Sequence, residues 1–403
     1  MIRIEIPDYV KKVLKSLERA GFKAFIVGGC VRDSIMGKIP DDWDVCTSAR
    51  PEQTMRVFNG IMPAIPTGIK HGTITILSDK IPVEVTTFRI DGSYSDKRRP
   101  DSVSFVTDIT RDLSRRDFTI NSMAYNTGEG LVDPFGGRKD ISRGVIRCVG
   151  EPEKRFSEDA LRIIRAIRFA SICGFRIEGE TENAIREMSE SLREIAMERI
   201  YAELRKLLSA KKPSEVLIKY RDVFEKILPE CFGSGNFDTK LCMAADKLPR
   251  VFALRLAAVC ASAGEKINPV MHHLKADSKT IRRVCRIVEN QTAKPPASKA
   301  EVLNLLREFG AETTVDIAEF KIATEENDIS NQWKSALLKI RRAVDNNECY
   351  SPAQLDINGS DLIKCGIRGQ MIGEVLNGLL TAVISGKCQN SKTELLEFFN
   401  KNC

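Results

Sequence analysis

The chain has few histidines, and it lacks the clustered cysteines and long apolar runs from which zinc, disulfide and membrane proteins are built. Its 403 residues include only three histidines, and its twelve cysteines are dispersed singly, with no C-x-x-C pair. This pattern excludes the Cys/His spacing of zinc sites and predicts reduced thiols that serve as small core residues. No run is long and apolar enough to span a bilayer, and no apolar signal segment opens the chain, so we expect a cytoplasmic protein.

What is present is ordinary for a folded protein. Hydrophobic residues make up 42% of the chain and charged residues 29%, a balance that excludes a fibrous or largely disordered protein. The length of 403 residues allows about two to four compact units. The formal net charge of +7 is compatible with a polyanionic partner, although many proteins with this charge bind none.

The first pattern with chemical meaning lies shortly after the N-terminal region. An apolar run, Ala24–Val27, predicts a buried strand that ends at Gly28 and Gly29. Two glycines permit backbone dihedrals and close approaches that a Cβ would forbid, and the planar guanidinium of Arg32 suits phosphate oxygens. A plain chain reversal is the alternative, since most Gly-Gly turns bind nothing. A triphosphate site is the functional interpretation.

Two carboxylates follow this turn. Residues Asp42–Val45 predict a strand, and because side chains alternate along a strand, Asp42 and Asp44 are expected on one face. Paired carboxylates beside a phosphate site are typical of Mg²⁺-dependent nucleotidyl transfer, although an isolated D-x-D is usually a solvated turn. On the strand predicted over Val83–Phe88, Glu84 is either a third acid beside this pair or a solvated edge residue.

Local periodicity predicts the surrounding elements. Helices are expected over Pro7–Arg19, Pro51–Phe58 and Leu113–Tyr125, and strands over Thr73–Leu77 and Val83–Phe88. The polar segment Asp91–Asp101 predicts a loop, either a plain hairpin tip or a mobile basic element over the site. Strand signals become scarce after Gly150, where helical periodicity takes over. A mixed head followed by helices is therefore expected.

A helix is predicted over Glu158–Cys173, with Ser157 as its N-cap. On such a helix Asp159, Arg162 and Arg165 would share one arc. A surface face with i,i+3 ion pairs is the simpler interpretation. The functional alternative is base recognition, because an Asp acceptor beside an Arg donor complements the amino group and ring nitrogen of cytosine and adenine. Guanine and uracil present the reverse order and would leave both groups unpaired.

In this order the patterns resemble the bacterial class II tRNA nucleotidyltransferases of the polymerase β-like superfamily. The motifs that carry the resemblance are G-G-x-V-R-D, D-x-D, R-R-D-x-x-x-N, D-P-F-G-G, E-D-x-x-R-x-x-R-A and a fifth helical motif at Glu198–Leu208. The resemblance implies an α+β fold with a nucleotidyltransferase head over residues 1–150 and a helical neck over 151–210. A helical body over 211–300 and a helical, tRNA-binding tail over 301–403 would follow.

The resemblance also implies roles for individual residues. Asp42 and Asp44 would be the catalytic residues and would hold two Mg²⁺ ions, with Glu84 as the undecided third carboxylate. Arg116 would meet the nucleotide phosphates and Asp117 the ribose. The nucleotide-binding set would be Gly29, Arg32, Arg116, Asp117, Asp159, Arg162, Arg165 and Arg168.

The activity that follows is addition of C, C and A to the tRNA 3′ end from CTP and ATP, with release of pyrophosphate and without a nucleic-acid template. CC-only addition, A-only addition and poly(A) polymerase are the alternatives within the family. The complete segment Asp91–Asp101 argues for full CCA addition. A catalytically inactive tRNA-binding protein is the alternative from another class, and the intact Asp42 and Asp44 argue against it.

Two departures from the family are visible. The histidines, His71, His272 and His273, form no H-D pair, so the metal phosphohydrolase domain of some relatives is not expected. In the tail, the common Gly-x-x-Pro-Gly is replaced by residues 366–369, Gly-Ile-Arg-Gly. The expected partners are tRNA, CTP and ATP, with no membrane, while the choice between a monomer and a homodimer stays open.

Overall fold

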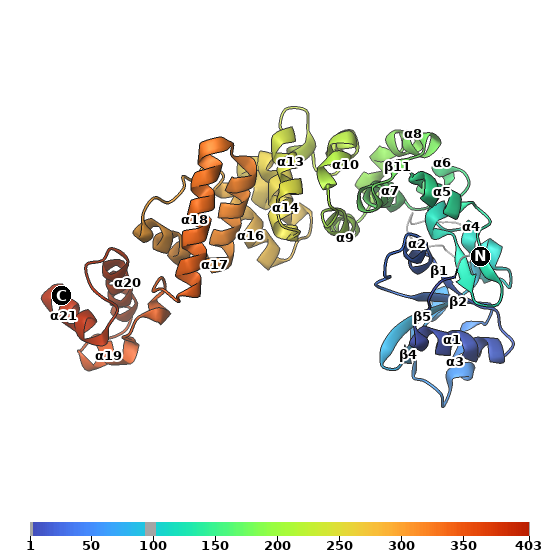
Figure 1. Cartoon of the computed structure of the whole chain (residues 1–403), viewed down its shortest axis with the longest axis horizontal. Coiled ribbons are helices and arrows are strands. Elements are labelled where there is room, and N and C mark those ends of the chain that lie inside the picture. The colour runs from blue at the N-terminus through green and yellow to red at the C-terminus, as the bar shows by residue number, and fades with distance from the viewer. Residues whose placement is uncertain (1–2, 93–101, 403) are drawn as a thin grey trace. The chain divides into compact units, whose positions relative to one another are not determined.

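The computed structural model describes residues 3–92 and 102–402, which form two compact units (Figure 1). The N-terminal unit comprises Met1–Lys211 and Lys219–Pro229, and the C-terminal unit comprises Lys212–Ile218 and Glu230–Cys403. All strands of the described chain belong to the first unit, whereas the described part of the second is helical. The predicted α+β class is therefore confirmed. Most of the loop predicted over Asp91–Asp101 lies outside the described residues.

A seven-stranded sheet of order β3-β4-β5-β2-β1-β8-β9 forms the centre of the N-terminal unit. Its strands are β1 (Ala24–Val27), β2 (Asp44–Thr47), β3 (Ala64–Gly68), β4 (Thr73–Ser78), β5 (Ile81–Thr87), β8 (Ala124–Asn126) and β9 (Gly130–Val132). Neighbouring strands are antiparallel except β2 and β5, which run parallel. Because Ile26 pairs with Val45, the end of β1 lies beside the start of β2. The register thus brings the Gly-Gly turn and the D-x-D motif together.

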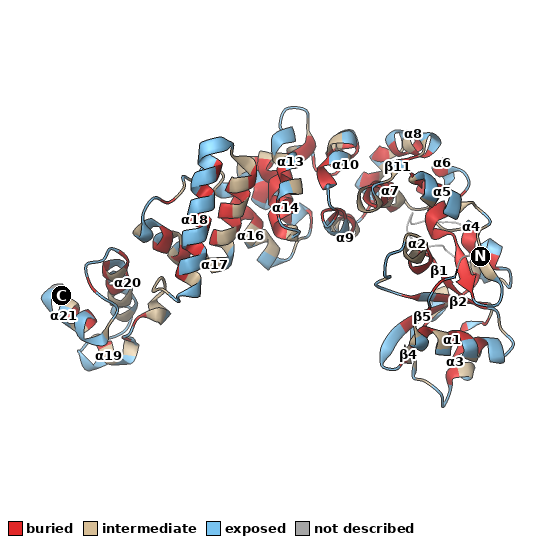
Figure 2. Ribbon diagram, viewed as in Figure 1, coloured by how far each residue is buried: buried red, intermediate tan, exposed pale blue. Residues whose placement is uncertain are grey.

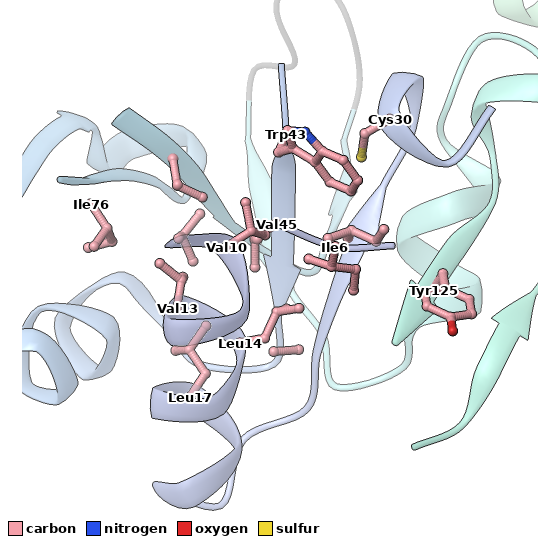
Figure 3. Packing of buried hydrophobic residues seen from close by; sticks show 14 of the residues in the cluster. Ile6, Val10, Val13, Leu14, Leu17, Cys30, Trp43, Val45, Ile76 and Tyr125 are labelled. Atoms are coloured by element: carbon pink, nitrogen blue, oxygen red, sulfur yellow. The ribbon is translucent and has the colours of Figure 1, made fainter. Parts of the chain in front are cut away.

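Both faces of this sheet are covered, which explains why β1 is buried at every position. On one face, α1 (Asp8–Arg19) and α3 (Pro51–Phe58) pack on the sheet through a cluster of buried hydrophobic side chains. Figure 3 shows Val10, Val13 and Leu14 of α1 in this cluster. The opposite face is covered by a second cluster, which includes Phe25 of β1.

The helix predicted over Leu113–Tyr125 is wrong. Helix α4 (Ile109–Ser114) ends early, and a 3₁₀ turn, η2 (Thr119–Asn121), leads directly into β8. The backbone is extended at Phe118, which forms a β-bridge with Cys148, while the Thr119 N–H donates to the Arg147 carbonyl at 2.9 Å. Pairing with a segment about 30 residues away therefore overrides the local helical pattern.

The helix predicted over Glu158–Cys173 is divided in two. Helix α6 (Pro152–Glu158) begins earlier, with a proline in its first turn, and α7 (Leu161–Cys173) follows after a break. Ser157 lies inside α6 and is not an N-cap. The break falls at Asp159, whose backbone is extended (φ −154°, ψ 102°) and whose carboxylate accepts the Leu161 N–H at 3.2 Å. An aspartate that satisfies a free N–H of the next helix favours such a break.

Several shorter elements complete the N-terminal unit. They are η1 (Ile69–His71), the pair β6 (Arg89–Asp91) and β7 (Val103–Phe105), α5 (Gly137–Arg143), the parallel pair β10 (Val145–Ile146) and β11 (Arg176–Ile177), α8 (Gly179–Glu187), η3 (Ser189–Glu194), α9 (Met197–Leu207) and α11 (Arg221–Glu225), together with α2 (Gly29–Ile35) at the end of β1. Helix α9 packs on α7 through its buried face, which includes Ile200 and Leu204.

The C-terminal unit is a succession of packed helices. Two short helices, α10 (Pro213–Lys219) and α12 (Pro229–Phe232), span its junctions with the first unit, and the others are α13 (Thr239–Lys247), α14 (Phe252–Cys260), η4 (Ala261–Lys266), α15 (Ile267–His273), α16 (Ser278–Glu289), α17 (Lys299–Thr324), α18 (Asn327–Asp345), η5 (Pro352–Gln354), α19 (Gly359–Lys364), α20 (Met371–Ile384) and α21 (Lys392–Asn402). Helix α14 is buried from Ala253 to Cys260, whereas one side of α18 is exposed (Figure 2). No helix in the described ranges is both long and apolar enough to cross a bilayer.

Gly137, at the start of α5, provides a test of the packing in the N-terminal unit. A Cβ at this position would overlap the Thr119 carbonyl oxygen and lie 3.0 Å from the Met123 Cγ. Because backbone must move to admit it, we expect Gly137→Ala to lower the free energy of unfolding by about 1–3 kcal/mol. The measurement is urea unfolding followed by Trp43 fluorescence in a Trp333→Phe background.

Gly128→Ala is the matched control, since a Cβ there would meet only the Asn126 Oδ1, at 3.8 Å. We expect this substitution to change the free energy of unfolding by less than about 0.5 kcal/mol. Equal effects of the two substitutions would contradict the packing that the structure assigns to Gly137.

Candidate active site

The Gly-Gly turn lies at the end of β1 and starts α2. Gly28 has φ 79° and ψ −124°, a conformation that side chains with a Cβ rarely adopt, and its N–H donates to the Met123 carbonyl at 3.1 Å. A Cβ on Gly28 would lie 3.0 Å from the Arg116 Nη1. Glycine is therefore required at position 28 both for the turn and for the close approach of the Arg116 guanidinium. The two residues belong to different sequence motifs.

Arg116 is the least engaged guanidinium at this turn. Its Nη2 lies 3.4 Å from the buried Asp112 carboxylate, and its Nε is buried without a hydrogen-bond partner in the described residues. The pKa of Asp112 is lowered overall, because the attraction of Arg116 and Arg115 outweighs the opposing effect of burial. An under-satisfied guanidinium beside an open glycine turn fits an anionic ligand such as a phosphate.

The two carboxylates of the D-x-D motif lie beside this turn. Asp44 is the first residue of β2, so the predicted strand begins two residues later than expected and Asp42 precedes it. Asp44 stands in register with Glu84 of β5, and both side chains are exposed, while the flanking Val83 and Val85 are buried. Glu84 therefore lies in a central strand and not at a sheet edge.

The surroundings of Asp44 are electrically negative. Partial loss of water raises the pKa of its carboxyl, Glu84 and Asp42 raise it further, and Arg116 opposes them. Among residues 3–92 and 102–402, no three His, Cys, Asp or Glu side chains are placed to hold a metal ion together. A pair of exposed aspartates such as Asp42 and Asp44 is chemically suited to Mg²⁺, since this ion is commonly bound by one or two carboxylates together with substrate phosphates.

Asp117 is the centre of a buried hydrogen-bond network. Its Oδ2 accepts from Arg165 Nε at 2.9 Å and Nη2 at 2.6 Å. Its Oδ1 accepts from the Phe118 N–H at 2.9 Å and from Asn121 Nδ2 at 3.2 Å. Burial tends to raise the pKa of this carboxyl, but Arg165 outweighs that effect and holds the pKa at about 2. The carboxylate therefore stays ionised and fully hydrogen-bonded.

This network extends in both directions. On one side, Asn121 Oδ1 accepts from Arg32 Nη1 at 2.7 Å, and Arg32 also pairs with Asp33 at 2.8 Å. On the other side, Glu203 of α9 lies 3.6 Å from Arg165 and 2.5 Å from Arg168. Arg32 of α2 and the arginines of α7 are thereby joined in one chain of hydrogen bonds and ion pairs.

A phenylalanine ring supports the same arginines. The guanidinium carbons of Arg32, Arg165 and Arg168 lie 5.1, 5.5 and 3.8 Å from the centre of the Phe169 ring. Such cation–π contacts are favourable and restrict the orientation of the guanidinium groups. Neither Phe169 nor Glu203 was identified from the sequence. The fifth motif, Glu198–Leu208, contains Glu203 and was the available signal for that residue.

The predicted pairing of Asp159 with its neighbours on one helical arc is wrong. Asp159 lies in the break between α6 and α7, and its carboxylate is bound by Arg199 of α9, with Nη1–Oδ1 at 3.1 Å and Nη2–Oδ2 at 2.7 Å. Arg162 instead donates to Glu158 at 2.7 Å and to the Arg115 carbonyl at 3.3 Å. The predicted i,i+3 ion pair is thus replaced by two separate contacts.

The buried Asp117 carboxylate generates a prediction about acid. Its folded-state pKa of about 2 lies below the usual 3.8, so its contribution to stability is present above pH 4 and is lost as the pH falls toward 2. We expect the difference in unfolding free energy between the wild type and Asp117→Asn to shrink by about 2 kcal/mol between pH 6 and pH 2. Urea unfolding followed by Trp43 fluorescence measures it.

Asp222→Asn is the control, because Asp222 forms an exposed pair with Arg186 and exposed pairs contribute little. A difference between the wild type and Asp117→Asn that stayed constant from pH 6 to pH 2 would contradict the depressed pKa of Asp117.

Three family models match the chain. Residues 24–147 match the Poly A polymerase head domain, which contains the sheet and the D-x-D motif. Residues 174–232 match a probable RNA and SrmB-binding site of polymerase A, and residues 253–399 match a putative tRNA nucleotidyltransferase domain 2. The matches extend over both compact units.

Relatives match over nearly the whole chain. The CCA-adding enzyme of Ligilactobacillus salivarius is 34% identical over 420 residues, which cover 98% of each chain. That of Geobacillus stearothermophilus is 33% identical over 405 residues, covering 97% of this chain and 98% of its own.

Solved structures share the fold. The crystal structure of Bacillus stearothermophilus CCA-adding enzyme in complex with CTP matches with a TM-score of 0.79 at 30% identity, covering 99% of this chain and 100% of its own. The Thermotoga maritima CCA-adding enzyme complexed with tRNA shares the fold at 23% identity, with a TM-score of 0.67 over 98% of this chain and 96% of its own. With relatives this similar along its full length, the chain belongs to the family of the CCA-adding enzymes, which are nucleotidyltransferases.

Proposed function

We propose that this chain adds C, C and A to the 3′ end of tRNA, using CTP and ATP and releasing pyrophosphate, without a nucleic-acid template. The observation that carries the proposal is the meeting of the D-x-D carboxylates with Gly28 and the under-satisfied Arg116 at one end of β1 and β2. Carboxylates for metal ions and a guanidinium for phosphates are what nucleotidyl transfer needs. The activity of relatives that match nearly the full length supports the same conclusion.

Asp42 and Asp44 would hold two Mg²⁺ ions, and Glu84, in register with Asp44, would add negative charge beside them. Bound there, the ions neutralise the triphosphate and lower the pKa of the attacking 3′-hydroxyl. The exposed carboxylates at the start of β2 leave room for phosphate oxygens to complete the coordination. No other cofactor is required for this reaction.

The triphosphate would be held by the residues around the Gly-Gly turn. Arg116 is partly exposed and only weakly paired with Asp112, and Arg32 is already oriented by Asp33 and Asn121. The absence of a side chain at Gly29 leaves the backbone accessible to a phosphate. An oriented guanidinium loses less conformational freedom when it binds a phosphate than a free one would.

The ribose contact implied for Asp117 carries a structural requirement. Each of its oxygens already accepts two hydrogen bonds, so its four acceptor sites are occupied. A ribose hydroxyl would bind only by displacing one of these donors. We infer that Asp117 acts mainly by orienting Arg165 and Asn121, which in turn contact Glu203 and Arg32.

The base would be read by Asp159 and Arg162, which flank the start of α7. An acidic acceptor and a guanidinium donor complement the amino group and ring nitrogen shared by cytosine and adenine. Arg165 and Arg168, on the same helix, support the site through Glu203 and Phe169. The helical segments after residue 210, with a tail over 301–403, would bind the tRNA in the cytoplasm.

The experiment that tests this function uses three tRNA transcripts, ending at the discriminator base, in C and in CC. Each is incubated with the purified protein and Mg²⁺, with CTP and ATP supplied separately and together, and the products are resolved to single nucleotides. We expect C, C and A to be added to the first transcript and addition then to stop. Addition of CC only, of A only to the CC end, or of a long A tail would each contradict full CCA addition.

The metal carboxylates are tested by substitution. We expect Asp42→Ala to lower the rate of incorporation at least about a hundredfold, because the ions that activate the 3′-hydroxyl lose a ligand. Binding of tRNA, measured by filter retention, should stay within about twofold, since the D-x-D motif is not proposed to hold the tRNA.

Asp41→Ala is the matched control, because it removes the same charge from the neighbouring exposed residue. It should retain most of the activity. Unchanged incorporation by Asp42→Ala would overturn the assignment of the catalytic carboxylates.

A further inference from the structure

The carboxylate proposed to read the base is held by a residue to which no role has yet been given. Arg199 binds both oxygens of Asp159 in a bidentate pair, at 3.1 and 2.7 Å. The Arg199 side chain is 20% exposed and the Asp159 side chain 14%, so the pair is largely shielded from solvent. A bidentate guanidinium fixes the plane of a carboxylate, which a single contact does not.

The hydrogen bonds of Asp159 leave it with one acceptor site. Oδ1 accepts from Arg199 Nη1 and from the Leu161 N–H, at 3.1 and 3.2 Å, which occupies both of its lone pairs. Within the described part of the chain, Oδ2 accepts only from Arg199 Nη2, at 2.7 Å. One acceptor site on Oδ2 therefore remains for a ligand. An exocyclic amino group, as on cytosine or adenine, needs one acceptor at this place.

No other residue described near Asp159 fixes it in this way. Arg162, three residues on, is engaged by Glu158 at 2.7 Å and by the Arg155 carbonyl at 3.1 Å. Arg199, in contrast, projects from α9, whose buried Ile200 and Leu204 anchor that helix in the core. Because α9 packs on α7, the guanidinium is carried by a rigid element.

We propose that Arg199 is a positioning residue for nucleotide selection, which holds the Asp159 carboxylate in one orientation so that a single acceptor site faces the amino group of the incoming base. The inference rests on the base-reading role proposed for Asp159. Uracil places a carbonyl oxygen where cytosine places its amino group, so a fixed acceptor repels it. A carboxylate free to rotate would turn aside and discriminate less.

The test is the selectivity of the first addition. With the full-length protein, Mg²⁺ and a tRNA transcript ending at the discriminator base, kcat/KM is measured for CTP and for UTP. We expect Arg199→Met to lower the ratio of CTP over UTP at least about tenfold. Arg199→Lys keeps the charge but not the planar fork, so its ratio should fall between those of the wild type and Arg199→Met.

A merely structural role for Arg199 makes a different prediction. In that case Arg199→Met would lower the melting temperature and the yield of active protein, while the ratio of CTP over UTP would be unchanged. Arg186→Met is the matched control, because it removes another guanidinium–carboxylate pair of the same unit, Arg186–Asp222 at 2.6 Å. Its selectivity should equal that of the wild type.

Asp159→Ala separates this inference from the base-reading proposal. If Asp159→Ala leaves the ratio unchanged, base reading fails and the role of Arg199 falls with it. If Asp159→Ala lowers the ratio but both Arg199 variants retain it, base reading stands and the positioning role is overturned. In an Asp159→Ala background, Arg199→Met should have no further effect, and a second tenfold loss would also overturn the proposal. If Arg199→Met does not fold, Arg199→Lys decides by the same ratio.

Discussion

The site depends on one buried carboxylate that is kept ionised among arginines. Asp117 accepts four hydrogen bonds, and Arg165 holds its pKa at about 2 despite its burial. A buried ion pair adds little net stability, because desolvation offsets most of the attraction, but removal of one partner strands a charge. The Asp117–Arg165 pair matters here because it fixes the orientation of the side chains around it. Through Asn121 and Glu203 the same network fixes the arginines of α2 and α7.

Backbone positions impose the second constraint. The two central strands are aligned so that the end of β1 meets the start of β2, and only glycine at position 28 permits both the turn and the nearby Arg116. The negative charges of Asp42, Asp44 and Glu84 gather next to this positive group. The acidic group and the Arg116 guanidinium thus lie side by side, an arrangement expected of a site that binds metal ions together with phosphates.

Much of the head was predictable from the sequence, because its elements follow from local patterns. The strand Ala24–Val27 and the helix Pro51–Phe58 have the predicted bounds, since an apolar run between breakers and a proline at a helix start are local signals. The failures lie where pairing is distant. Phe118 is drawn out of a helical pattern by Cys148, which no local window contains. Sequence motifs therefore identified the candidate site residues near such segments, but they did not predict which side chains those residues contact.

Asp159 shows why the contacts were beyond local reasoning. The helical arc assumed one continuous helix, but the chain breaks at Asp159 and its carboxylate turns toward another partner. That partner, Arg199, is 40 residues away on α9. A residue in a break is oriented by what packs against it and not by its own periodicity. The motif that contains Asp159 supplies the carboxylate. Its orientation, on which the inferred selectivity depends, comes from Arg199 of α9.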